Sequence, residues 1–271
     1  MHQETSRFWR AMGRASAGAL LFVLPLLMTM EMWELGFYLD RLKIALLLVV
    51  LLPLLVGLSY FSGFKHTLDL WEDAIDALTA WVVGALLVIG ILVLLAIVKP
   101  VDSFDAMAGK AILLTIPASI GAVIASKQLG QKDNGDDDVV CASYGGELFI
   151  MAAGALLLAL NVAPTEEMVL IAYKMSVWHA LLLSVFTLAI MHAMVYMLAF
   201  RGTEAGPDAL GHGPVFYSFT IAGYAVALLV SAYVLWTFGR FEGSGLELNI
   251  MSSTVLAFPA GVGAAVSRLV L

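Results

Sequence analysis

The chain has 271 residues, of which 61% are hydrophobic and 13% are charged, and its formal net charge is −7. A soluble domain carries about 25% charged and about 45–50% apolar residues, so this composition excludes a water-soluble globular protein and predicts a membrane protein. The acidic balance argues against a nucleic-acid partner, because binding phosphates needs a basic surface. The single cysteine, Cys141, excludes an internal disulfide and a cysteine-cluster metal site.

The apolar runs predict an all-α polytopic membrane protein with about eight transmembrane helices. A helix needs about 20 largely apolar residues to cross a bilayer, where lipid offers the backbone no hydrogen-bond partner. The runs are too long and too continuously apolar for the alternating strands of a barrel. Helices are expected at 15–35, 43–61, 74–98, 104–126, 146–163, 168–200, 213–238 and 246–269.

The first run follows three arginines, Arg7, Arg10 and Arg14, as a signal peptide would. No small-residue cleavage site follows it, so we expect a retained first span. Counting cations on alternate loops places eight on the side of the N-terminus and six on the other side. This difference favours cytoplasmic N- and C-termini.

Residues 130–140 form the one polar low-complexity patch between apolar runs and are rich in Gly and Asp. Such a composition is typical of a linker, and its aspartates lack the spacing of an EF-hand calcium loop. The linker predicts an N-terminal four-helix repeat at 1–129 and a C-terminal four-helix repeat at 141–271.

Two proline-bearing segments indicate this duplication. Residues 116–122 read Ile-Pro-Ala-Ser-Ile-Gly-Ala, and residues 258–264 read Phe-Pro-Ala-Gly-Val-Gly-Ala. Four spans is an even number, so the copies would enter the membrane in the same sense, as parallel repeats. We expect the two segments to meet where the halves join.

The same segments leave two interpretations open. Their small residues suit close helix packing in lipid, and a proline inside a helix frees a carbonyl one turn earlier. The helices are therefore either kinked packing elements or the walls of a polar path. The path would be lined by Thr115, Pro117, Ser119, Ser252, Ser253, Thr254 and Pro259.

Glu31 is the leading candidate for an ionisable group inside a span, where such groups are costly and often functional. On a continuous helix Leu27, Glu31 and Glu34 share a face, so two carboxylates could point into one cavity. There they would exchange a proton or hold a cation. The alternative places both carboxylates in water at the level of the lipid headgroups.

His192 and the methionine pair Met28 and Met32 are further candidates for a functional site. His192, deep in the sixth helix, could titrate near neutral pH or serve as a hydrogen-bonded core residue. Met28 and Met32 resemble the Met-xxx-Met pair of copper transporters, and thioethers suit Cu(I). Methionine also fills gaps between helices without any metal.

Residues 24–33 read Leu-Pro-Leu-Leu-Met-Thr-Met-Glu-Met-Trp and precede Gly36. This string, after the arginine-bearing N-terminus, resembles the opening of an uncharacterised family of bacterial integral membrane proteins. By length and span layout the likeness extends over most of the chain. The resemblance implies a bacterial inner (plasma) membrane protein and gives no residue a role.

The leading hypothesis is a channel or secondary transporter for a small cation, passive or proton-coupled, with its pathway between the two repeats. The rival is a membrane scaffold or assembly protein in which the same features serve packing. The chain contains no Gly-x-Ser-x-Gly, His-Glu-x-x-His or Walker motif, so neither catalysis nor a cofactor is expected. The expected partners are the lipid bilayer and a small cation, and a homo-oligomer stays open.

Overall fold

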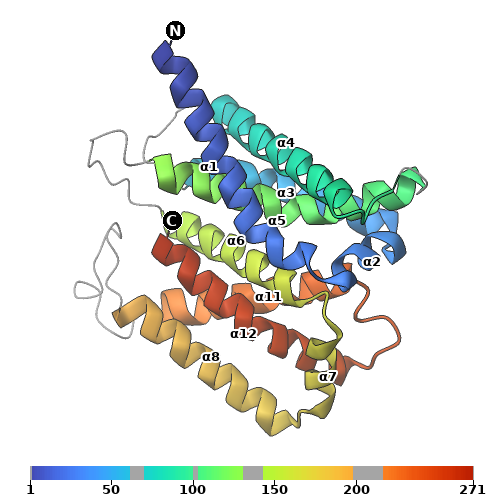
Figure 1. Ribbon diagram of the computed structural model, residues 1–271. Coiled ribbons are helices and arrows are strands. Elements are labelled where there is room, and N and C mark those ends of the chain that lie inside the picture. Colours follow the sequence, from blue (N-terminus) through green and yellow to red (C-terminus); the bar gives the residue numbers. More distant parts are fainter. Residues whose placement is uncertain (1, 62–69, 100–102, 131–142, 198–215, 271) are drawn as a thin grey trace. The chain divides into compact units, whose positions relative to one another are not determined.

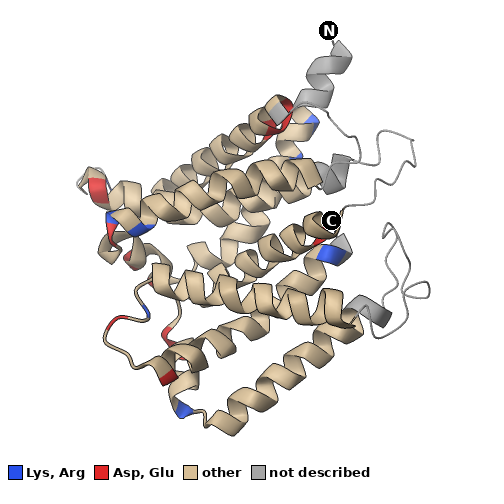
Figure 2. Ribbon diagram, turned by 180° about the vertical axis from the view of Figure 1, so that it is seen from behind, with Lys and Arg blue, Asp and Glu red and all other residues tan. Residues whose placement is uncertain are grey.

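The computed structural model describes residues 2–61, 70–99, 103–130, 143–197 and 216–270. Within these residues all regular structure is helical, and eight helices are long and apolar enough to cross a membrane. The chain divides into two compact units, Met1–Asp138 and Val139–Leu271 (Figure 1). Lys, Arg, Asp and Glu residues lie mostly near helix ends and connections, and the middle parts of the helices are largely uncharged (Figure 2).

The N-terminal unit is built around one helix, α5. Every residue from Leu113 to Ile124 in this helix is buried, because α1, α2, α3 and α4 all pack against it. Its run of Ala, Gly and Ser lets neighbouring backbones approach closely, which is how helices gain contact in lipid. The unit comprises α1 (His2–Leu27), α2 (Met30–Tyr38), α3 (Arg41–Phe61), α4 (Leu70–Leu94) and α5 (Phe104–Gly130).

The C-terminal unit is built around α12 in the same way. This last helix contacts α6, α7, α8 and α11, and it carries Pro259 as α5 carries Pro117. The unit comprises α6 (Tyr144–Val162), α7 (Glu166–Lys174), α8 (Val177–Met197), the π-helix η2 (Phe216–Ile221), α11 (Ala222–Thr237) and α12 (Leu246–Val270).

The two units share one series of elements. Each begins with a long helix, followed by a nine-residue helix (α2 or α7) and a 21-residue helix (α3 or α8). In each unit the proline-bearing helix also packs most extensively on the first helix. A duplication would produce such shared features, and the duplication stays a prediction.

The two units also share a pattern of backbone hydrogen bonds at the C-terminal ends of α4 and α11. The Ile97 amide donates to the Leu92 carbonyl over 3.0 Å, and the Arg240 amide donates to the Leu235 carbonyl over 2.9 Å. The residue before each amide is left-handed, Ala96 with φ 56° and Gly239 with φ 71°. Both helices therefore end in the Schellman motif.

Two of the predicted helices are broken in the structure. The predicted helix at 15–35 is α1 and α2, interrupted at Met28 and Thr29, and the predicted helix at 168–200 is α7 and α8, interrupted at Met175 and Ser176. At the first break the Trp33 Nε1 group donates to the Leu27 carbonyl over 3.1 Å. Side-chain hydrogen bonds of this kind satisfy the groups that a break leaves without a backbone partner.

Some predictions lie outside the described residues. They include most of the 130–140 linker, the single cysteine, and the ends of the predicted helices at 168–200 and 213–238.

Candidate functional site

Glu31 lies in the first turn of α2, after the break in the first predicted helix. The candidate span of this region is Trp9–Leu27, so Glu31 and Glu34 follow it along the chain. Glu31 is half-buried and Glu34 is exposed. The break also interrupts the helical face that was expected to join Leu27 to the two carboxylates.

The hydroxyl-bearing residues of the predicted path on α5 and α12 are buried, and four of them donate within their own helices. Thr115 Oγ1 donates to the Ala111 carbonyl over 2.7 Å, and Ser119 Oγ donates to the Thr115 carbonyl over 2.6 Å. In α12, Ser253 and Thr254 donate to the carbonyls of Asn249 and Ile250, and Ser252 is buried. Pro117 is buried and Pro259 is half-buried. The hydroxyl donors of Thr115, Ser119, Ser253 and Thr254 are thus used by the preceding turn, as in packed helices.

Met28 and Met32 do not lie on the same helix, because α2 begins at Met30. Met28 is 64% exposed in the break after α1, and Met32 is fully buried on α2. They therefore do not form an i,i+4 pair on one helix. Within the described residues no group of three or more His, Cys, Asp or Glu side chains could hold a metal.

His192 on α8 contacts the π-helix. Its Nδ1 atom lies 3.1 Å from Thr220 Oγ1, and its ring meets the Phe216 ring edge to face at 5.2 Å. Thr220 is fully buried. π-Helical turns often occur at functional sites, because the extra residue redirects side chains.

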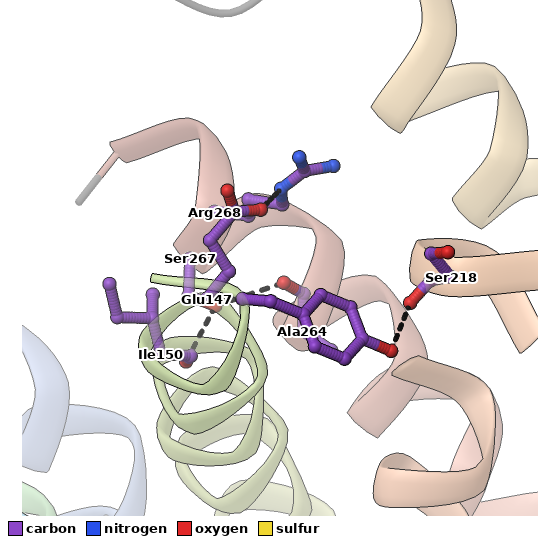
Figure 3. Close-up of polar contacts among 7 residues, drawn as sticks. Glu147, Ile150, Ser218, Ala264, Ser267 and Arg268 are labelled. Carbon is purple, nitrogen blue, oxygen red and sulfur yellow. Dashed lines mark hydrogen bonds and ion pairs between the residues drawn. The ribbon is translucent and has the colours of Figure 1, made fainter. Parts of the chain in front are cut away.

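A buried ion pair joins α6 to α12 within the C-terminal unit. Arg268 Nε lies 2.6 Å from Glu147 Oε2, and the two side chains are only 7% and 12% exposed (Figure 3). Glu147 occupies the first turn of α6, and Arg268 the last turn of α12. They lie at the ends of two candidate spans, Glu147 near the start of Tyr144–Val162 and Arg268 at the end of Leu246–Arg268.

Aromatic and hydroxyl groups support this pair. The Arg268 guanidinium carbon lies 3.7 Å from the centre of the Phe219 ring, a cation–π geometry. Ser267 Oγ lies 2.9 Å from the Ile150 carbonyl and 2.9 Å from the Ala264 carbonyl, and the Tyr144 hydroxyl donates to the Ser218 carbonyl over 2.9 Å (Figure 3). We call Tyr144, Glu147, Phe219, Ser267 and Arg268 the charged cluster.

The charged cluster also reaches His192 through the π-helix, because Phe219 and Thr220 are neighbours along the chain.

Removing a carboxylate and a guanidinium from water costs several kcal/mol per ion, which only close pairing offsets. Charged groups inside spans are rare for that reason, and they commonly mark ion or proton pathways. The cluster is therefore the strongest candidate site among the described residues.

The N-terminal unit buries a carboxylate too. Asp73, in the first turn of α4, is 2% exposed and accepts a hydrogen bond from Ser59 Oγ over 3.0 Å. In the first turn of α4 its negative charge also interacts favourably with the positive end of the helix dipole.

In the part of the chain that the structure describes, eight apolar helices with charged groups near their ends define a polytopic α-helical integral membrane protein, embedded in a lipid bilayer. The chain belongs to the DUF2391 family, described as "Putative integral membrane protein", whose family model matches residues 11–271. This assignment agrees with the resemblance found in the opening motif. No curated protein and no solved structure matches the chain.

Proposed function

We propose that the protein is a channel or secondary transporter for a small cation in the bacterial inner membrane. In this proposal Glu147 is the carboxylate that binds the proton or the cation in exchange for Arg268. The observation that carries it is the Glu147–Arg268 pair, buried at 2.6 Å within two spans.

The proposed exchange of Arg268 for a proton or a cation follows from the free energy that an unpaired buried charge costs. Breaking a buried pair by removing one partner costs about 3–5 kcal/mol, so a cation that takes the place of Arg268 stabilises Glu147 whenever Arg268 moves away. A proton or a small cation can supply that charge. The face of the Phe219 ring, 3.7 Å from the guanidinium carbon, remains as a partner for Arg268.

His192 gives the proposal a route to proton coupling. Movement of Arg268 shifts its contact with Phe219, and the adjacent Thr220 contacts the His192 ring. An imidazole ring can accept a proton at one nitrogen and donate one from the other, which suits it to relay protons. We infer cytoplasmic N- and C-termini, because the cations on alternate loops number eight on the side of the N-terminus and six on the other side.

The test measures flux of K⁺, Na⁺, H⁺ and Ca²⁺ into proteoliposomes that contain the full chain. The informative variant is Glu147→Gln combined with Arg268→Gln, because it removes the carboxylate without leaving a buried charge unpaired. We expect flux in the wild type and none in the double variant. Wild-type flux in the double variant would remove Glu147 from the mechanism.

Three further variants complete the experiment. Glu166→Gln changes an exposed carboxylate on α7 and should leave flux unchanged. Glu31→Gln and Asp73→Asn compare the other two candidate carboxylates with Glu147. Loss of flux in Glu31→Gln alone would favour the carboxylate after the first span as the binding group.

A membrane scaffold or assembly protein is the second candidate. It is favoured by the hydroxyls of α5 and α12, which donate to their own helices as packing residues do. A folded wild type that conducts none of the four ions would support this alternative. Copper transport is the weaker third hypothesis, since Met28 and Met32 do not share a helix face.

A further inference from the structure

Two adjoining cavities open in the N-terminal unit beside the first half of α5. One, of about 490 Å³, lies among α2, α3 and α5, and we call it the polar cavity. The other, of about 400 Å³, lies among α3, α4 and α5, and we call it the apolar cavity. Leu48, Ala108 and Ile112 line both, so the two cavities share a wall.

The apolar cavity is suited to a hydrocarbon chain. Its lining is aliphatic or aromatic apart from Thr115, whose hydroxyl already donates to the Ala111 carbonyl. Ile89, Val93 and Phe104 line it and are 47%, 57% and 79% exposed, so the cavity borders the surface that faces lipid. Its volume lies within the range of small-molecule sites, about 300–1,000 Å³.

The polar cavity carries one exposed group of each charge. Arg41 Nη2 lies 2.7 Å from Asp105 Oδ2, with the side chains 84% and 69% exposed, and both residues line the cavity. Lys110 follows Gly109 along α5 and lines neither cavity. Lys110 Nζ donates to the Ile97 carbonyl over 3.2 Å.

We propose that these cavities bind one phospholipid of the bilayer with a phosphoethanolamine headgroup. An acyl chain occupies the apolar cavity, the phosphate pairs with Arg41, and the primary ammonium pairs with Asp105. An exposed ion pair is worth little in itself, so its two members can exchange partners at small cost. A headgroup with a phosphate and an ammonium complements both members at once.

The charges also discriminate among headgroups. A phosphocholine ammonium has no N–H and cannot donate a hydrogen bond to Asp105. A phosphoglycerol headgroup offers no cation, which leaves Asp105 beside an added negative charge. The site should therefore prefer phosphatidylethanolamine over phosphatidylcholine and phosphatidylglycerol with the same acyl chains.

Native mass spectrometry of the full chain, exchanged from detergent into equimolar mixtures of these three lipids, tests the preference. We expect phosphatidylethanolamine to be retained about two- to five-fold over each of the others, as one exposed charge pair allows. Asp105→Asn should reduce the ratio over phosphatidylcholine to about one while leaving the fold intact. Ala111→Phe, which fills the apolar cavity, should lower retention of all three lipids.

Glu34→Gln is the matched control, because it removes an exposed carboxylate of the same unit that lines neither cavity. It should keep the wild-type ratios. Equal retention of the three lipids by the wild type, or a preference for phosphatidylglycerol, would overturn the proposal. An unchanged ratio in Asp105→Asn would do the same, since the ammonium would then bind elsewhere.

Discussion

Gly154 on α6 and Gly263 on α12 pack backbone against backbone, so that a Cβ atom on either glycine would overlap the carbonyl oxygen of the other. Gly18 on α1 and Gly121 on α5 make the equivalent contact in the N-terminal unit. Lipid tails are as apolar as the side chains, so burying side chains between helices gives little hydrophobic free energy. Van der Waals contact between closely packed backbones supplies the attraction instead. Both units are therefore held by the same first-to-last helix contact.

Substitutions at these glycines should destabilise each unit. Gly154→Ala, Gly263→Ala and Gly18→Ala each insert a methyl group into backbone, which costs about 1–3 kcal/mol by overpacking. Gly90→Ala on α4 is the matched control, because nothing lies within 4 Å of its added Cβ. Thermal unfolding in detergent should show a lowered midpoint for the first three, and an unchanged or raised midpoint for the control.

The shared Schellman motif predicts opposite effects at its two left-handed positions. Ala96→Gly should stabilise the N-terminal unit by about 0.5–1 kcal/mol, because a glycine adopts a positive φ without steric cost. Gly239→Ala should destabilise the C-terminal unit by a similar amount. Denaturant titration measures both changes, and a destabilising Ala96→Gly would show that Ala96 is not strained by its φ of 56°.

The buried ion pair predicts a strongly non-additive mutant cycle. Glu147→Gln and Arg268→Gln alone each leave a buried charge without its partner, at a cost of about 3–5 kcal/mol. The double variant leaves no charge and should cost less than either single variant. Unfolding of all four proteins in one detergent gives the coupling, and additive costs would mean that water reaches the pair.

The first helix break predicts a local effect at the tryptophan that bridges it. Trp33→Phe removes the donor to the Leu27 carbonyl, which should cost about 1–2 kcal/mol and speed amide exchange in α2. Trp178→Phe, at a side chain that is 73% exposed, serves as the control. Equal exchange rates in α2 for both variants would argue that other contacts hold the break.

The number and order of spans were predictable from sequence, because lipid demands long apolar helices and the runs are clearly separated. The two helix breaks were not predictable from the sequence. Met28-Thr29 and Met175-Ser176 contain neither Pro nor Gly, and helical periodicity continues across them. Contacts made only after folding, such as the bond from Trp33 to Leu27, stabilise the interrupted backbone.

The charged cluster was missed for a related reason. Glu147 and Arg268 lie near opposite ends of the C-terminal half, and no short motif connects them. One signal was present: each is an ionised group within an otherwise apolar run, and such groups usually find a partner of opposite charge. The sequence favoured Glu31 as the ionisable group instead, because an unbroken first helix would have placed it inside a span.

The contact between the first and last helices of each unit also sets an order of events at the ribosome. Gly18 and Gly121 are separated by about 100 residues, so at about 5–20 residues per second the first helix waits about 5–20 s for its main partner. Gly154 faces a similar delay before Gly263 is synthesised. During each interval the nascent helices must be sheltered by lipid or by the insertion machinery, and a codon change that slows translation there would lengthen their exposure.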